Sequence, residues 1–320
     1  MKKVLITGIT GFAGQYLAEF LVKRDDTAEI HGTYHSEEGK KRLGELQEKI
    51  ILHQCDLTQK NDIDAIIQQV QPQEIYHLAA QTSPGESIKD PAMTLTTNTL
   101  SELYLLEALK TQELSQTRIL VVSTSEIYGA VRPEDLPIDE DTPLRPTTPY
   151  AVSKITQDFL ALQYFLSHKM QIIRVRPFNH TGPRQQPKFV LPMFAKQIAE
   201  IDKGIKEPVM KVGNLKARKD FTDVRDVVRA YFFLMEKGLP GEVYNIGSGK
   251  SVEIQEMLDT LLSFTNKKIK IEVDPGLYRP IDTPDVVCDF TKLQNLTSWK
   301  PEIPLETTLK DTLEYFKKVV

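Results

Sequence analysis

The first apolar run of the chain leads directly into a glycine-rich turn. Residues 3–7 (KVLIT) read as a short strand, and residues 14–24 have the periodicity of a helix. Between them, Gly8, Gly11 and Gly14 have the spacing GxxGxxG, a variant of the dinucleotide-binding fingerprint. Glycines at such a point permit a tight turn and let backbone amides approach a pyrophosphate at a helix N-terminus. This feature predicts a Rossmann-type nucleotide site; glycines that serve only the turn are the alternative.

Strand-like and helix-like segments alternate over the first 180 residues. Near-continuous apolar strands between amphipathic helices are typical of a parallel sheet that is covered on both faces. We therefore predict an α/β fold with a doubly wound parallel Rossmann sheet, whose ligands lie beyond the carboxyl ends of the strands. The further predicted strands are residues 29–34, 50–57, 74–80, 118–124 and 172–178, and the further helices are residues 61–70, 99–110 and 150–167.

The pattern changes near residue 180, where a stretch rich in Pro, Gly and basic residues (180–192) interrupts the alternation. We predict an NAD(P)-binding Rossmann domain over residues 1–180 and, mainly over residues 181–320, a smaller mixed α/β substrate-binding lobe, with some segments returning to the first domain. The predicted helices of this half are residues 193–203, 223–236, 253–264 and 305–319, and the predicted strands are residues 209–213, 243–247 and 268–273.

Composition excludes several classes of protein. The formal net charge of −4 gives no electrostatic footprint for nucleic acid. No apolar run reaches the roughly 18 residues that a membrane-spanning helix needs, and the first residues lack a signal-peptide pattern. Cys55 and Cys288 are too few for a disulfide framework or a zinc site, and the six histidines lack ligand spacing. We expect a cytoplasmic protein that uses no metal.

The end of the second predicted strand bears on the choice of cofactor. No Asp or Glu stands directly at that end to bind a ribose 2′-hydroxyl and repel a 2′-phosphate. Tyr34 and His35 stand there instead, with three basic residues over 40–42. This pattern favours NADP(H) and leaves NAD(H) possible. Asp56, after the third strand, is a candidate for the adenine amino group or a cap of the following helix.

Tyr150 and Lys154 are four residues apart in a predicted helix, so both side chains lie on one face. A phenol has a reference pKa of about 10, and a neighbouring ammonium group together with an oxidised nicotinamide favours the phenolate. Thr124 emerges at the carboxyl end of a predicted strand, where its hydroxyl could bond the reacting oxygen. These residues predict a proton-transfer site; simple packing of Tyr150 at a helix start is the alternative.

Several longer segments resemble the extended short-chain dehydrogenase/reductase family that acts on nucleotide sugars. The segments are GITGFAGQYL, STSEIYG, PYAVSK, RPFNHTGPRQ, GNLKARKDFTDVRDVVRAY and LYRP, which together run through the whole chain. The second half is most similar to GDP-4-keto-6-deoxy-D-mannose reductases, and STSEIYG also resembles GDP-mannose 4,6-dehydratases. The resemblance implies a nucleotide-sugar substrate, with a GDP-linked sugar favoured.

The strand-end residues and the resemblance together predict three sets of site residues, and the sequence predicts no metal site. The catalytic set is Thr124, Glu126, Tyr150 and Lys154. The cofactor-binding set is Gly8, Gly11, Phe12, Gly14, Tyr34, His35, Asp56, Leu57, Ala79, Tyr150 and Lys154. The substrate-binding set is Asn179, Lys188, Phe189, Val190, Arg218 and Arg279. A guanidinium group suits phosphate because it donates paired hydrogen bonds. A solvated basic loop around Arg218 and a core position for Phe189 are the alternatives.

Two reactions are compatible with this site. In a 4-keto reductase, hydride reaches C4 of the sugar and Tyr150 protonates O4. In a 4,6-dehydratase, a carboxylate must also take the C5 proton, and Glu126 has the type and spacing for that step. The C-terminal half and the chain length of 320 residues favour the reductase. An epimerase, and a cofactor-binding protein without turnover, are the remaining alternatives, because fold alone does not establish activity.

The helices predicted over residues 99–110 and 150–167 have apolar residues on more than one face. In the resembled family such helices pair across a two-fold axis, so we expect a homodimer. A wholly buried helix would give the same pattern.

Overall fold

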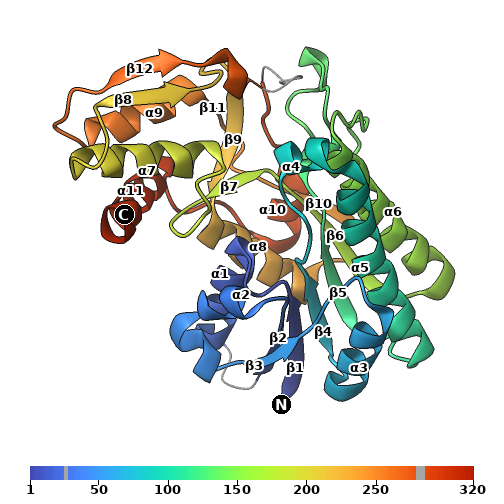
Figure 1. Ribbon diagram of the computed structural model, residues 1–320. Helices are drawn as coiled ribbons and strands as arrows, with labels where there is room; N and C mark the ends of the chain where they lie inside the picture. Colours follow the sequence, from blue (N-terminus) through green and yellow to red (C-terminus); the bar gives the residue numbers. More distant parts are fainter. Residues whose placement is uncertain (25–27, 279–284) are drawn as a thin grey trace.

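A seven-stranded parallel sheet forms the centre of the molecule, as the computed structural model in Figure 1 shows. The structure describes residues 1–24, 28–278 and 285–320. The strand order of the central sheet is β3–β2–β1–β4–β5–β6–β10, so the direction of winding reverses between β1 and β4. Their bounds are β1 Lys2–Thr7, β2 Ala28–Tyr34, β3 Ile51–Gln54, β4 Glu74–His77, β5 Arg118–Val122, β6 Gln171–Pro177 and β10 Val243–Ile246. The predicted doubly wound α/β fold is confirmed.

Helices cover both faces of this sheet because neighbouring residues of each strand point to opposite sides. Leu120 packs with α1 (Phe12–Arg24) and α8 (Val224–Lys237). Ile119 and Val121, on either side of it, pack in a second core. That second core lies under three helices, which are α3 (Lys60–Val70), α5 (Pro91–Thr111) and α6 (Pro149–His168). Both faces of the sheet are thus buried, which explains the unbroken apolar strands.

The second half of the chain forms a smaller region beyond the carboxyl ends of the strands, at the upper left of Figure 1. It has its own apolar core under α7 (Val190–Asp202), α9 (Ile254–Ser263) and α11 (Leu305–Val319). A parallel pair joins β8 (Val209–Val212) to β12 (Lys270–Val273). A three-stranded sheet has the order β11–β9–β7, with bounds Ser251–Glu253, Arg218–Asp223 and Asn179–Thr181. Segments β10, α8 and α10 (Thr291–Thr297) return to the central sheet.

Most predicted elements lie within a few residues of their expected bounds, and the differences have local causes. Helix α5 begins eight residues earlier than predicted because Asp90 caps it, accepting a hydrogen bond from the Met93 amide, and Pro91 fixes its first turn. Short elements were missed: α2 (Glu37–Lys41), α4 (Pro84–Lys89), α10, and the strands β7, β9 and β11. Four 3-10 turns were also missed, and they are η1 Gly44–Glu48, η2 Ser125–Ile127, η3 Pro133–Asp135 and η4 Pro275–Leu277.

The described residues contain neither a membrane-spanning helix nor a metal-ligand cluster. Among them, no helix combines the length and apolar character that crossing a bilayer requires. Within the same residues, no group of three or more His, Cys, Asp or Glu side chains is arranged to hold a metal ion.

Candidate active site

The glycine turn lies at the point where the winding of the sheet reverses. Gly8 follows β1 with a φ of +69°, and a Cβ on it would lie 2.8 Å from the Cα of Ala79, which follows β4. A Cβ on Gly14 would lie 2.5 Å from the Gly8 carbonyl oxygen. A side chain at Gly8 or Gly14 would clash with the backbone, so the turn requires glycine at both positions. The turn brings the N-terminus of α1 to the carboxyl edge of the sheet. This geometry fits the pyrophosphate of a dinucleotide cofactor.

Phe12, the first residue of α1, faces the second half of the chain. Its ring stacks on His180 with 6.0 Å between centroids and 4° between planes. Tyr16, one turn later, donates a hydrogen bond to the Pro183 carbonyl (2.9 Å), and Arg184 forms a bidentate ion pair with Glu19. These contacts join α1 to residues 180–184. The predicted cofactor turn and the predicted substrate segment are therefore packed against each other.

An acidic residue that the sequence analysis overlooked lies near the end of β2. The Tyr34 hydroxyl donates to Glu37 Oε1 (3.0 Å), and Lys40 Nζ lies 5.2 Å from the centre of the Tyr34 ring. Glu37 opens the short helix α2, which Ser36 caps. His35 is exposed beside this cap. A carboxylate is thus present near the end of β2, but it lies three residues beyond the strand and not at its last position.

Asp56, which follows the third strand, stabilises a turn and does not cap the next helix. Asp56 accepts hydrogen bonds from the amide (2.9 Å) and hydroxyl (2.7 Å) of Thr58, which close a turn before α3. These bonds hold the pKa of Asp56 below its ordinary value. Gln59, and not Asp56, is the N-cap of α3, so the capping alternative is wrong. Leu57 is half-buried inside the same turn.

Tyr150 and Lys154 lie together on the buried face of α6, 7% and 3% exposed. Thr148 caps this helix by accepting from the Ala151 amide (3.1 Å), so Tyr150 stands in its first turn. Lys154 Nζ donates to the Val122 carbonyl (2.5 Å) at the end of β5 and to Gln157 Oε1 (2.6 Å). The Thr124 side chain is close enough to the Tyr150 hydroxyl to lower its pKa. The three predicted residues are therefore brought together at the carboxyl end of β5.

Burial controls how these groups ionise. It raises the pKa of Tyr150; the Thr124 hydrogen bond opposes this, and the charge of Glu126 adds to it. Burial also lowers the pKa of Lys154 to about 8, against the attraction of Glu102 and Asp158. In the protein alone the Tyr150 pKa is thus raised, contrary to the effect expected from an adjacent ammonium group. The reason is that burial of the phenol outweighs the hydrogen bond from Thr124.

Glu126 lies two residues after Thr124 in the short turn η2. Its amide donates to the Thr124 hydroxyl oxygen (3.3 Å), and its side chain is half-buried. Because its charge acts on the pKa of Tyr150, the carboxylate is in the electrostatic range of the phenol.

The substrate-side candidates are distributed over two segments. Asn179 begins β7 directly after β6, in register with Phe221 of β9. Lys188 forms an ion pair with Glu86 of α4 (3.3 Å), and Phe189 and Val190 are half-buried at the start of α7. Arg218 opens β9, donates to the Ser251 carbonyl (2.8 Å) and approaches Glu256 (3.4 Å).

The loop alternative for Arg218 is thus wrong, because the residue belongs to a strand. Phe189 is half-buried at the N-cap of α7, so its side chain is not part of the fully buried core. Arg279 lies outside the described residues.

Polar residues that the sequence analysis did not single out surround Lys154. Asn98 of α5 donates to Ser153 of α6 (2.8 Å) and accepts from the Gln81 amide (2.7 Å). Glu102 and Gln157 are completely buried near the Lys154 ammonium group. The available signal was a set of polar residues at helical spacing within otherwise apolar helices.

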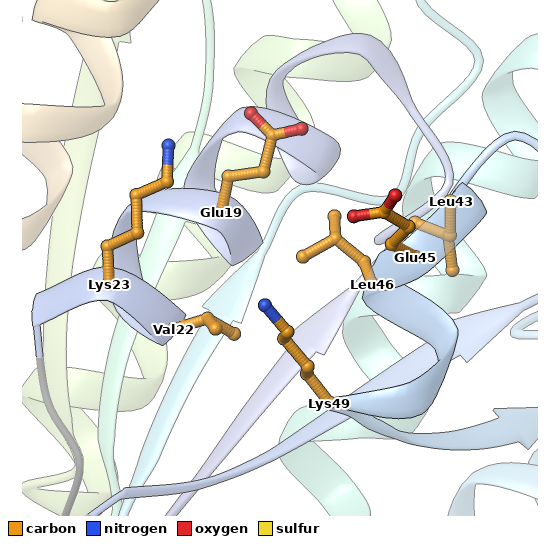
Figure 2. Close-up of a pocket in the computed structure, with 7 residues that line it drawn as sticks. All are labelled: Glu19, Val22, Lys23, Leu43, Glu45, Leu46 and Lys49. Atoms are coloured by element: carbon orange, nitrogen blue, oxygen red, sulfur yellow. The ribbon is translucent and has the colours of Figure 1, made fainter.

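A hollow of about 380 Å³ lies elsewhere, between α1 and η1. Figure 2 shows its lining residues, which are Glu19, Val22, Lys23, Leu43, Glu45, Leu46 and Lys49. None of the predicted site residues is among them, so we do not assign this hollow to the active site.

The sequence is similar to that of one family of known proteins. A family model described as GDP-mannose 4,6 dehydratase matches residues 5–312. The chain belongs to the GDP-mannose 4,6-dehydratase family. The family resemblance inferred from the motifs is thereby confirmed.

Two curated members of this family match nearly the whole chain. A GDP-6-deoxy-D-mannose reductase from Pseudomonas aeruginosa is 33% identical over 98% of this chain and 96% of the relative. A GDP-mannose 4,6-dehydratase from Yersinia enterocolitica is 30% identical over 96% of this chain and 91% of the relative.

Solved structures of nucleotide-sugar enzymes share the whole fold. RMD from P. aeruginosa, complexed with NADPH, has a TM-score of 0.87 and 31% identity, with 100% of each chain covered. A dTDP-glucose 4,6-dehydratase from Bacillus anthracis, in complex with NAD, has a TM-score of 0.84 and 25% identity, with 99% of this chain and 97% of the other covered. The chain is therefore an NAD(P)-dependent enzyme of the extended short-chain dehydrogenase/reductase type.

Proposed function

We propose that this protein reduces the 4-keto group of a nucleotide-linked 6-deoxyhexose, of the GDP-4-keto-6-deoxy-D-mannose type, to the alcohol. The observation that carries this proposal is the Tyr150–Thr124 hydroxyl pair at the carboxyl end of β5, beside the buried Lys154. Similarity over both full lengths to a GDP-6-deoxy-D-mannose reductase supports the choice of a reductase and of a GDP-linked sugar.

NADP(H) is the favoured cofactor of this proposal. The similar RMD structure contains NADPH, whereas the similar dehydratase contains NAD, so NAD(H) stays possible. Gly8, Gly11 and Gly14 would receive the pyrophosphate, with Phe12 and Ala79 beside them. Tyr34, His35, Asp56 and Leu57 would line the adenosine side, since they follow neighbouring strands.

The residues around Tyr150 would carry the proton transfer. When bound, the cofactor supplies a hydride to C4 of the sugar. The Tyr150 hydroxyl donates its proton to O4 as charge develops there, and Thr124 orients and polarises the same oxygen. With a pKa of about 8, Lys154 is mostly protonated at neutral pH. The ammonium group lies on the same helix face as the Tyr150 hydroxyl and would stabilise the phenolate that forms during turnover, although it does not lower the Tyr150 pKa in the protein alone.

The remaining candidates would bind the nucleotide sugar. Asn179 stands where β6 continues into β7, close to the carboxyl edge of the sheet. Lys188, Phe189, Val190, Arg218 and Arg279 would contact the nucleotide. Binding of a phosphate by Lys188 or Arg218 would replace their present contacts with Glu86 and Glu256. The division into a cofactor domain over residues 1–180 and a substrate lobe over residues 181–320 is part of the same proposal, and the cytoplasmic location stays a prediction.

A GDP-mannose 4,6-dehydratase is the second candidate. Glu126 favours it, because a half-buried carboxylate near Tyr150 could remove the C5 proton. The dehydratase from Y. enterocolitica is also similar over nearly the full chain. Epimerases of this fold would need no C5 base for a change at C4.

Incubation with two substrates separates these reactions. We expect the purified protein to oxidise one NADPH for each GDP-4-keto-6-deoxy-mannose that it consumes, measured at 340 nm together with chromatography of the sugar nucleotide. Conversion of GDP-mannose to the keto sugar with no net change in cofactor would instead establish the dehydratase. Binding of NADPH without turnover of either sugar would contradict both.

Glu126→Gln tests the same choice by mutation. For a reductase we expect kcat to change by less than about tenfold, because no proton leaves C5. For a dehydratase the loss of the base would cost about 10²–10⁴-fold. The matched control is Glu134→Gln in the neighbouring turn η3, a carboxylate at an exposed position. A loss of keto reduction beyond a hundredfold in Glu126→Gln alone would contradict the reductase assignment.

We also propose that the protein is a homodimer that pairs through α6. Val152, Phe159 and Leu166 are spaced by seven residues along this helix and are 43%, 49% and 56% exposed. Met93 at the start of α5 is 42% exposed. Such an apolar stripe on a surface helix favours burial against a second copy.

Phe159→Glu combined with Leu166→Glu is expected to convert the dimer into a monomer, because each charge would be buried in the pairing face. Light scattering coupled to gel filtration measures the mass. Ile205→Glu, which places the same charge on a 63% exposed apolar residue away from α6, should leave the dimer intact. A monomeric unmodified protein would contradict the proposal.

A further inference from the structure

A carboxyl group with no exposed surface lies between α5 and α6. Glu102 is 0% exposed, and neither of its carboxylate oxygens has a hydrogen-bond partner in the described part of the chain. An unpaired carboxylate in an apolar environment is costly, because it gives up its hydration without replacement. A buried Glu at this position is therefore either protonated or stabilised as a carboxylate by a nearby positive charge.

The nearby charge is Lys154. Gln157, also 0% exposed, lies one turn after it on α6 and accepts its ammonium hydrogen bond at Oε1 (2.6 Å). The other end of this amide, Nε2, is buried without a hydrogen-bond partner within the same described residues. The Lys154 charge acts on the pKa of Glu102, so the carboxyl group lies in the electrostatic range of the ammonium group. The unpartnered amide end of Gln157 and the unpartnered carboxyl group of Glu102 are thus both buried near Lys154, between two helices that the Asn98–Ser153 hydrogen bond (2.8 Å) joins.

The other charged groups around Lys154 are already compensated or neutral. Asp158, on the same helix, is held by Arg174 (2.7 Å) and Arg176 (2.9 Å) of β6. His77 of β4 bonds to Thr7 (2.9 Å), and burial together with the Lys154 charge lowers its pKa to about 3. Tyr150, with its raised pKa, is neutral at neutral pH. Among these neighbours, Glu102 is the acid whose charge has no bonded cation.

We propose that Glu102 is a positioning residue for Lys154, which acts across the Gln157 amide to keep the ammonium group charged and fixed at the carboxyl end of β5. The inference rests on the proposed function only in that Lys154 serves the cofactor and Tyr150. It adds a second helix, α5, to the parts that determine the state of the catalytic lysine.

The sign of the effect follows from the coupling of the two groups. Burial raises the pKa of Glu102 and the Lys154 charge opposes this, while burial lowers the pKa of Lys154 and Glu102 opposes that. Each group therefore favours the charged form of the other, and a carboxylate at Glu102 helps Lys154 to keep its proton as pH rises. Without the carboxyl group, Lys154 loses this support. Removing Glu102 should therefore discharge Lys154 at lower pH.

Glu102→Gln tests this inference, since it keeps the shape of the side chain and removes its ionisation. We expect the alkaline fall of kcat, and the alkaline weakening of NADPH binding, to move about one pH unit lower than in the unmodified protein. NADPH fluorescence titrations between pH 6 and pH 10 measure the second quantity. Glu107→Gln is the matched control: it removes a carboxylate from the same helix, one that bonds to Lys110 and Tyr164, and should shift neither curve.

Two further variants keep the inference separate from the proposed reaction. Lys154→Met should abolish the pH dependence of NADPH binding near pH 8, even for a protein that reduces no keto sugar. Gln157→Met, which keeps length and removes the amide, should shift the binding curve in the same direction as Glu102→Gln. Superimposable binding curves for Glu102→Gln and the unmodified protein, with both folded by circular dichroism, would overturn the role of Glu102.

Discussion

Tyr150→Phe is expected to lower kcat for keto reduction by about 10²–10⁴-fold, while NADPH still binds. The substitution removes one hydroxyl from a residue that is 7% exposed and leaves its ring in place. Without that hydroxyl, the developing charge on O4 has no bonded proton donor on α6, and Thr124 alone is left to polarise the oxygen. Stopped-flow or steady-state measurement of NADPH oxidation gives kcat, and fluorescence titration gives the NADPH dissociation constant.

Tyr164→Phe is the matched control, because this tyrosine is also buried on α6, 5% exposed, and bonds to Glu107 instead of facing Thr124. It should keep kcat within a few-fold of the unmodified enzyme. Equal activity of Tyr150→Phe and Tyr164→Phe would show that the phenol on the first turn of α6 is not the proton donor.

The parts of the site that were predicted from the sequence depend on short local patterns. The glycine turn requires only that a strand, three glycines and a helix follow one another, so Gly8 could be placed before any tertiary structure was known. Tyr150 and Lys154 share a helix face for the same reason, since four residues are about one turn. The doubly wound sheet followed from the alternation of apolar strands and amphipathic helices.

The parts that were missed depend on pairings between distant segments. Strands β7, β9 and β11 are three to six residues long, and their hydrogen bonds come from partners dozens of residues away, such as Asn179 with the Phe221 position. Glu102 is a typical solvent-facing residue by type, and only the packing of α5 on α6 reveals that it is buried. Glu37 was overlooked because the turn that folds it back onto Tyr34 comes after the strand end.

The ionic cluster around Asp158 also depends on contacts between segments that are distant in the sequence. We expect its loss to have the largest effect on stability. Asp158 is 0% exposed and accepts from Arg174 Nη1 (2.7 Å) and from Arg176 Nε (2.9 Å) and Nη2 (3.2 Å). Arg176 also donates to the Tyr128 hydroxyl (3.0 Å), which in turn donates to Asn245 of β10 (2.8 Å). One carboxylate thus joins α6 to the two last strands of the central sheet.

Asp158→Ala should lower the free energy of unfolding by about 3–5 kcal/mol, because it leaves two buried guanidinium groups without their counter-charge. The midpoint of urea unfolding, followed by circular dichroism, measures the change. Glu242→Ala is the control: it breaks the exposed ion pair with Lys292 (2.7 Å) and should cost less than about 1 kcal/mol. If the two variants unfolded at the same urea concentration, the buried cluster would not hold α6 on the sheet. Lys154 would then owe its position to the Val122 and Gln157 contacts alone.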